Sequence, residues 1–440
     1  MTEPFCLSEI GSERATVGDG NKIVTFDGRT HIVWQDITRE GYMNRVRSYD
    51  RAKAEWTDPL DLGVGLDNHA RPIITVDGDG YLHVVLGGHN SSVTWRRSTR
   101  PNDTSSWEDP VPIGEGTYPV LLCGPDGTLY LTLRANRHAG VDLYVKPLND
   151  EWTLRSRIVK NAEEYREAYG AFHMQMMMGP DGVIHAAIDF FEGQDEVGRG
   201  LHMAVCYCKS RDGGYSWEKA DGTAIAIPAR PEGMDTVARS IASRVEPLPR
   251  PEDINCAMLV DSASAPHLLW LSHRNAPGEL SLVQFGEDGT QTLNRLHPVL
   301  ESEWPDYRVT GARATILSDD TIYLLVELSP LNDQWIEGRP SREMGMVERD
   351  DLCLALVKTT DFGKTCEVET AIAPGKAFNS PNMEHGVGAN QMEPGRCPTF
   401  VYFDGTRGYP GGGDYYEKPV AEMLAAGEFV ENRVYVMLSS

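Results

Sequence analysis

Positive charge is scarce in this sequence of 440 residues, which has 41 Lys and Arg against 65 Asp and Glu and a formal net charge of −24. Nucleic-acid binding needs a basic face for phosphate contacts, so this balance argues against it. Long apolar runs are also missing, since no stretch approaches the ~20 residues of a membrane span. We therefore expect no nucleic-acid partner and no membrane partner, and nothing in the sequence points to a protein partner.

A secretion signal is missing as well. Residues 1–10 have neither a basic start nor an apolar run, so we expect a cytoplasmic protein, or a secreted one if a leader has been trimmed. The eight cysteines are spread along the chain, and only Cys206 and Cys208 are close, at a spacing that puts both on one face of a strand. We expect buried thiols there, in place of disulfides or a zinc site.

A short repeat runs along the whole chain: Asp-Gly, two residues, His or Tyr, and then an apolar strand. Clear copies begin at Asp27, Asp79, Asp126 and Asp181, and weaker ones lead to His267, Tyr323 and Tyr435. Asp-Gly between apolar runs is a hairpin signal, and a unit of about 50 residues with two hairpins is one four-stranded propeller blade. The seven copies predict an all-β fold, a seven-bladed β-propeller that forms a single domain over residues 1–440.

The repeat also assigns structural roles. Ser210–Trp217 fits the Asp-box pattern S-x-D-x-G-x-[ST]-W, and Thr359–Cys366 is a weaker copy. The Asp and the hydroxyls would tie such a turn together while the Trp packs beneath it, so we expect no catalysis from these turns. The repeat histidines occur in register with Tyr, so we expect them in the core: His31, His83, His185 and His267.

The candidate site emerges when the inner strands are aligned on their turns. Inner strands surround the channel of a propeller, and the loops near their starts usually form the binding face. Eight residues before the aligned turns of three successive blades stand His69, Tyr118 and His173. Strand geometry would direct all three towards one mouth. Nearby strand ends add further polar candidates: Asn68, His89, Arg134 and Asn136.

These residue types suit β-elimination from a uronic acid. The C5 proton lies α to a carboxylate, whose negative charge Arg or His must neutralise. A Tyr or a His then acts as the base, and a Tyr or a His acts as the acid towards the leaving oxygen. No paired carboxylates stand near these residues, which argues against ordinary glycoside hydrolysis.

Two alternatives stay open. A sialidase-type hydrolase would need a Tyr with a supporting carboxylate and three converging arginines, for which the candidates are Arg239, Arg244, Arg308 and Arg313. A non-catalytic carbohydrate-binding propeller would need no His–Tyr approach at all. A new ultraviolet-absorbing unsaturated uronate would separate elimination from both alternatives.

The residues also carry a family resemblance. The stretch from Asp67-Asn-His69 through Asp77-Gly-Asp-Gly80 to Gly87-Gly-His89 resembles the BNR-type seven-bladed propeller polysaccharide lyases, which include ulvan lyases and related rhamnose–glucuronate lyases. The resemblance continues through Thr117-Tyr118-Pro119, Leu133-Arg134, Ala171-Phe-His173 and Ile184-His185. In that family a His and a Tyr form the acid/base pair, while a second His and an Arg neutralise the carboxylate.

Carried over by motif, the resemblance implies proton transfer by His69 and Tyr118 and uronate binding by His89 and Arg134. We also expect substrate contacts from His173, Asn68 and Asn136. The implied reaction cleaves the bond at O4 of a rhamnose-linked glucuronate or iduronate in an ulvan-like acidic carbohydrate, which is the expected partner.

No cofactor is expected for this chemistry. Acidic oxygen ligands are plentiful and propeller channels often hold Ca²⁺, but no ligand spacing identifies a metal site. Because the net charge of −24 would repel a polyanion, the site requires a locally basic mouth that includes Arg134.

Overall fold

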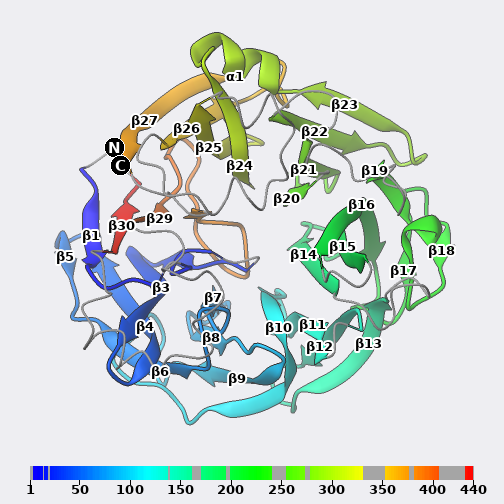
Figure 1. The fold of residues 1–440 in the computed structure, drawn as a ribbon. Coiled ribbons are helices and arrows are strands. Elements are labelled where there is room, and N and C mark those ends of the chain that lie inside the picture. Colours follow the sequence, from blue (N-terminus) through cyan, green and yellow to red (C-terminus); the bar gives the residue numbers. More distant parts are fainter. Residues whose placement is uncertain are drawn as a thin grey trace.

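The computed structural model is a ring of antiparallel sheets around a central axis (Figure 1). It describes residues 3–12, 14–17, 20–136, 139–160, 170–194, 199–239, 254–272, 278–330, 352–375, 381–405 and 432–439. The prediction of an all-β propeller is confirmed. In this described part, no helix has the length and apolar composition needed to cross a membrane.

The strands fall into six hydrogen-bonded sheets in the described residues. The first contains β2 (Ile23–Phe26), β3 (Arg29–Thr38), β4 (Gly41–Asp50), β5 (Glu55–Trp56) and β6 (Leu60–Gly65). The second contains β7 (Pro72–Val76), β8 (Leu82–Leu86), β9 (Ser91–Arg97), β10 (Val111–Cys123), β11 (Leu129–Ala135), β12 (Val141–Lys146) and β13 (Thr153–Val159). The third contains β14 (Gly170–Met178), β15 (Ile184–Gln194), β16 (Arg199–Ser210), β17 (Trp217–Glu218), β18 (Ala224–Ile225) and β19 (Asp235–Arg239).

The remaining three sheets have four strands each. They contain β20 (Ile254–Val260), β21 (Pro266–Ser272), β22 (Glu279–Phe285) and β23 (Gln291–Arg295); then β24 (Tyr307–Ile316), β25 (Ile322–Pro330), β26 (Leu352–Thr359) and β27 (Glu367–Gly375); and finally β28 (Asn382–Met383), β29 (Phe400–Asp404), β30 (Arg433–Met437) and β1 (Phe5–Ser8). The helical elements are short: η3 (Pro231–Gly233) and α1 (His297–Glu303).

Strand β10 joins two parts of the seven-stranded sheet. Its first half, Val111–Gly116, pairs with β9, whereas its second half, Gly116–Cys123, pairs with β11. The strand thus ends one four-stranded unit and begins the next. The count of seven blades depends on dividing the sheet at this point, and it stays a prediction.

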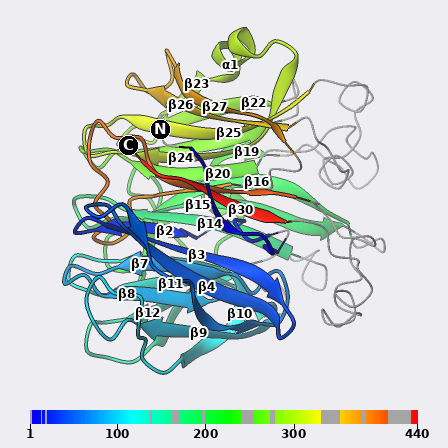
Figure 2. The same cartoon turned by 90° about the vertical axis from the view of Figure 1, so that its left-hand side faces the viewer.

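The two ends of the chain close the ring. Strand β1 pairs with β30, with Cys6 opposite Tyr435, so that N-terminal and C-terminal sequence share one sheet. Figure 2 shows the N-terminal and C-terminal ends of the chain close together, as this pairing requires. The pairing covers strand edges that would otherwise be open to other chains.

The repeat residues have the structural roles predicted for them. Trp217 is 1 % exposed beneath a turn in which the Ser210 hydroxyl donates to Asp212 over 2.9 Å and the Ser216 hydroxyl donates to Asp212 over 2.6 Å. Cys206 and Cys208 are buried free thiols. The four repeat histidines are buried, each with a hydrogen-bond partner: His31 with Ser48, His83 with Asp77, His185 with Tyr207 and His267 with Asp261.

Residues 384–392 lie across the channel at the end where the inner strands finish. The Gln391 N–H donates to Thr25 at the end of β2 over 2.8 Å, and the Ala389 N–H donates to Val76 at the end of β7 over 2.9 Å. Gly388 has φ +61, and a side chain there would clash with the Val76 carbonyl. The starts of the inner strands, where His69 and Tyr118 stand, therefore form the opposite mouth.

The buried histidines predict how stability depends on pH. Burial lowers the pKa of His31 to about 4, against 6.5 for an exposed imidazole. Between these two pH values the unfolded chain binds a proton at His31 and the folded chain does not. The free energy of unfolding therefore falls as pH drops from about 6.5 towards 4, by roughly 3 kcal/mol for this residue. In chemical denaturation between pH 7.5 and 4.5, His31→Gln should lose less unfolding free energy than the wild type. Equal losses in both proteins would contradict this assignment.

Candidate active site

The carboxylate of Asp67, which is 3 % exposed, holds two histidines at the channel mouth. Its Oδ1 accepts the His69 backbone N–H over 2.6 Å, and its Oδ2 accepts His89 Nδ1 over 2.6 Å. The two imidazole rings stack with centroids 4.1 Å apart. Burial opposes ionisation of Asp67, but the hydrogen bonds from His69 and His89 outweigh it, so its pKa lies below its ordinary value.

The protonation state of His69 follows from its neighbours. Arg14 Nη1 lies 3.2 Å from His69 Nε2, and because arginine can only donate, Nε2 must be the acceptor. The ring proton therefore sits on Nδ1, which faces Asp67 Oδ1 at 3.3 Å. Burial lowers the pKa of His69 to about 3 against the hydrogen bond to Asp67, and the charges of Arg14 and Arg71 lower it further. His69 is thus neutral at pH 7, with its basic nitrogen on Nε2.

Tyr118 stands at a bulge in β10. The register with β11 shifts between Thr117 and Val120, and Tyr118 has φ +56, in the left-handed region that bulky residues rarely adopt. Pro119 follows, and proline restricts the residue before it to extended conformations in most contexts. Such backbone strain costs on the order of 1–3 kcal/mol and concentrates at functional sites, so the fold around Tyr118 must hold it there.

The three residues aligned from the sequence lie together. The ring centroids of His69 and Tyr118 are 6.2 Å apart, and those of Tyr118 and His173 are 4.7 Å apart. His173 comes from β14, where it pairs with Asp189 of β15. Residues from three successive inner strands therefore share one mouth of the channel.

Arg134 lies behind Tyr118 and away from solvent. Its guanidinium carbon is 4.7 Å from the Tyr118 ring centroid, and its Nη2 donates to Thr117 over 2.9 Å and to Asn90 over 3.3 Å. The residue is only 1 % exposed. In this conformation its charge acts on the Tyr118 ring.

The other predicted candidates differ in where they lie. Asn68 is buried in the loop between Asp67 and His69. Asn136 donates from Nδ2 to Glu115 Oε2 over 2.6 Å. Of the arginines considered for a sialidase, Arg244 and the side chain of Arg239 lie outside the described residues. Arg308 and Arg313 donate to backbone carbonyls of their own strand region.

Sequence reasoning missed three residues of this site: Asp67, Arg14 and Arg71. Arg71 Cζ is 6.0 Å from the Tyr118 ring centroid, and the residue is 4 % exposed. Asp67 and Arg71 flank His69 in the sequence, so their position beside it was the available signal. Arg14 precedes β2 outside the repeat, and no sequence pattern connected it to His69.

The cluster of His69, His89 and Asp67 is also a candidate metal site. Among the described residues, one group of three offers ligand atoms that all lie within 4.8 Å of one another: Asp67, His69 and His89. Ligands of a tetrahedral zinc at 2.0–2.1 Å from the ion would be separated by about 3.3 Å. The 2.6 Å between Asp67 Oδ2 and His89 Nδ1 is shorter than that and fits a hydrogen bond. In this arrangement these two atoms share a hydrogen bond, and the three residues stay a candidate for holding an ion.

This chain is similar to known proteins in both sequence and fold. Residues 24–308 match a family model described as a BNR repeat-containing family member. An ulvan lyase of Nonlabens ulvanivorans is 24 % identical over 375 residues, covering 74 % of this chain and 73 % of its own length. An ulvan lyase, PL25, of Pseudoalteromonas sp. (strain PLSV) is 26 % identical over 158 residues, covering 30 % of this chain and 32 % of its own.

Solved structures agree in fold. A structure described as a new family of polysaccharide lyase, PL25 ulvan lyase, has a TM-score of 0.68 at 16 % identity and covers 91 % of this chain and 93 % of its own. A second structure of that lyase, bound to -[GlcA(1-4)Rha3S]-, has a TM-score of 0.67 at 16 % identity with the same coverage. At this identity the likeness shows the propeller fold alone.

The hydrogen bonds to Asp67 predict a stability loss in Asp67→Asn. A neutral amide cannot replace the carboxylate as acceptor for both histidines, and hydrogen bonds to charged groups contribute about 1.5–3 kcal/mol. We expect a loss of that size by chemical denaturation at pH 7. Because the pKa of Asp67 is depressed, the loss should stay constant above about pH 4 and shrink only below it. The exposed Asp79→Asn is the control, and equal stability of the two variants would contradict the role of Asp67.

Proposed function

This chain belongs to the BNR repeat-containing family, and from that premise we propose that it is a polysaccharide lyase that cleaves an acidic polysaccharide by β-elimination. The observation that carries the proposal is the convergence of a neutral His69, Tyr118 and three guanidinium groups at one mouth of the propeller. The likeness to ulvan lyases, over 74 % of the chain in one relative, supports the same reaction.

The reaction requires a base, an acid and a neutralised carboxylate. The base takes the C5 proton of a uronate, the electrons of the C–H bond form the C4=C5 double bond, and the C4–O4 bond breaks. The leaving O4 takes a proton from the acid. Because the carboxylate beside C5 is negative, cations or hydrogen-bond donors must stabilise the extra charge that develops on it.

The protonation states favour one direction of proton transfer. His69 Nε2 carries a lone pair and is the group ready to accept the C5 proton. The Tyr118 hydroxyl is ready to donate to O4, and the Arg134 guanidinium on its ring stabilises the phenolate that remains. Acid and base are thus separate groups with separate environments, as general acid–base catalysis needs.

The carboxylate of the sugar would bind between Arg14 and His89. Arg14 lies at the mouth and now donates to His69 Nε2, so a carboxylate that attracts this guanidinium would free the lone pair for proton transfer. His89 keeps its side chain 20 % exposed while Asp67 holds its Nδ1. Arg134 adds positive charge from behind Tyr118, and His173 borders the same ring. No cofactor enters these steps.

The proposed substrate is a polysaccharide in which rhamnose is linked to O4 of glucuronate or iduronate. The family resemblance and the relative solved with -[GlcA(1-4)Rha3S]- motivate this choice. Incubation with a panel of uronic-acid polysaccharides, followed by ultraviolet absorbance of the conjugated double bond, tests it. If unsaturated product is released only from a different uronic-acid polysaccharide, the proposal of lyase activity stands and the choice of substrate is wrong.

One observation favours a sialidase-type hydrolase as the second candidate. Three arginines, Arg14, Arg71 and Arg134, do surround Tyr118 and His69, as such an enzyme would need. Arg71 and Arg134, however, are 4 % and 1 % exposed and face the tyrosine ring, so two members cannot present themselves to a sugar carboxylate. Asp67 is engaged by both histidines, which leaves it unsuited to support Tyr118 as a nucleophile. The elimination accounts for more of the site.

Removal of the Tyr118 hydroxyl should abolish turnover. Tyr118→Phe keeps the ring on Arg134 but cannot donate a proton, and general acid groups contribute roughly 10²–10⁴-fold. We expect kcat to fall by at least that factor while substrate binding survives. Tyr144→Phe, a half-exposed tyrosine of β12, is the matched control and should retain the wild-type rate. Wild-type elimination by Tyr118→Phe would show that the acid lies elsewhere.

Arg14→Gln should change the pH dependence of the rate. The charge of Arg14 helps to hold the pKa of His69 at about 3, so its removal raises that pKa towards 6.5. Since only neutral His69 can act as the base, the acidic limb of kcat/KM should move to higher pH, and the whole profile should fall as the carboxylate loses a partner. Arg29→Gln, which removes an ion pair with Asp50, is the control. A profile that falls without moving would contradict His69 as the base.

A further inference from the structure

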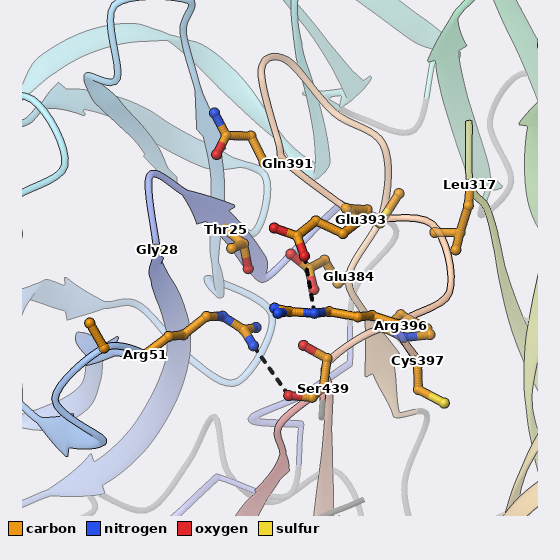
Figure 3. Close-up of a pocket in the computed structure, with 13 residues that line it drawn as sticks. Thr25, Gly28, Arg51, Leu317, Glu384, Gln391, Glu393, Arg396, Cys397 and Ser439 are labelled. Carbon is orange, nitrogen blue, oxygen red and sulfur yellow. Dashed lines mark hydrogen bonds and ion pairs between the residues drawn. The ribbon is translucent and has the colours of Figure 1, made fainter. Parts of the chain in front are cut away.

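A second cavity lies at the opposite end of the channel from Tyr118. It measures about 320 Å³ and is formed by the turn after β2, the turn after β4, the segment 384–398 and Ser439 (Figure 3). Strand β7 (Pro72–Val76) rises roughly 13 Å from the loop that carries His69 to the segment 384–392, which contacts Val76. The cavity is therefore separate from the proposed active site.

Two guanidinium groups meet in this cavity. Figure 3 shows Arg51 and Arg396 pointing toward one another from opposite sides. Arg51 is anchored at the floor, where Nε donates to Thr30 over 2.9 Å and Nη1 donates to the Ser439 carbonyl over 3.2 Å. Arg396 is exposed at the rim and uses Nε for an ion pair with Glu393 at 3.0 Å. Arg51 Nη2 also donates to Thr399 over 3.3 Å, and Glu384 and Glu393 line the same cavity and offset part of the positive charge. The Nη groups of Arg396 are directed into the cavity, where their N–H groups are donors for an oxyanion.

A buried carboxyl group completes the floor. Glu384 is 2 % exposed and lines the cavity, and its Oε2 accepts the Thr399 N–H over 3.3 Å. Its Oε1 is buried and has no hydrogen-bond partner among the described residues. A buried polar atom of this kind costs free energy unless a partner satisfies it, so a ligand with a hydroxyl group would relieve the cost. Burial also raises the pKa of Glu384.

We propose that this cavity binds a small hydroxylated oxyanion, of the class of sugar acids, with the guanidinium groups of Arg51 and Arg396 on the oxyanion and Glu384 Oε1 on a hydroxyl. The volume of about 320 Å³ suits a single sugar ring. The site lies away from the proposed catalytic residues, so the proposal stands independently of the lyase activity.

Calorimetric titration of the full chain with D-glucuronate, inorganic sulfate and glucose tests the site. Glucuronate supplies both the oxyanion and the hydroxyls, sulfate supplies the oxyanion alone, and glucose supplies the hydroxyls alone. We expect glucuronate to bind at least tenfold more tightly than either of the others. Glucose binding as tightly as glucuronate would overturn the role of the arginines, and sulfate binding as tightly would overturn the role of Glu384.

A matched pair of variants tests whether the heat of glucuronate binding comes from this cavity. Arg396→Gln removes the rim guanidinium and its ion pair with Glu393 three residues earlier, whereas Arg100→Gln removes an equivalent exposed ion pair with Asp103 outside the cavity. Glucuronate binding should weaken at least tenfold in Arg396→Gln alone. Equal binding in the two variants would overturn the proposal. The elimination rate of Arg396→Gln on polysaccharide should stay within twofold of the wild type. Binding and elimination are thus measured separately, so failure of the cavity proposal can be told from failure of the proposed lyase function.

Discussion

The carboxylate of Asp67 is the interaction on which the site depends. It is buried, yet it accepts from both His69 and His89, and these hydrogen bonds keep it ionised. Because Asp67 fixes the proton of His69 on Nδ1, the basic Nε2 faces the mouth, where Arg14 donates to it. One carboxylate therefore sets the tautomer of one histidine and the orientation of both, and the two imidazoles stack with centroids 4.1 Å apart.

The second constraint is the backbone of β10. The strand serves two parts of the ring, and it changes partner at Gly116, directly before the bulge that carries Tyr118. A bulky residue at φ +56 is costly, and the register with β11 shifts at the same place, between Thr117 and Val120. The strain places the tyrosine between His69 and His173 on one side and Arg134 on the other. The propeller thus supplies a rigid frame for a phenol that would not adopt this position in a free loop.

The repeat made the fold and much of the site predictable. Turns recur about 50 residues apart, and counting eight residues back from them found His69, Tyr118 and His173. The count succeeded because the inner strands run to turns at the same end of the channel, so equal distances along the chain reach similar depths. The burial of individual side chains was not predictable. Arg134 stands on the expected strand end, but it packs behind Tyr118 and is buried. Arg14 was missed because it precedes the first repeat, and its contact with His69 spans 55 residues. Asn136 stands on the strand end beside Arg134, and its amide donates to Glu115.

The central claim is that the His69–Tyr118 pair eliminates and does not hydrolyse. The most direct measurement counts two products in one digest of a rhamnose–glucuronate polysaccharide: new reducing ends and ultraviolet-absorbing unsaturated uronates. Elimination breaks the C4–O4 bond and forms one double bond for every new reducing end, so the account predicts equal numbers throughout the digest. Reducing ends that accumulate without the absorbing product would mean that water attacks the glycosidic bond, and they would contradict the account.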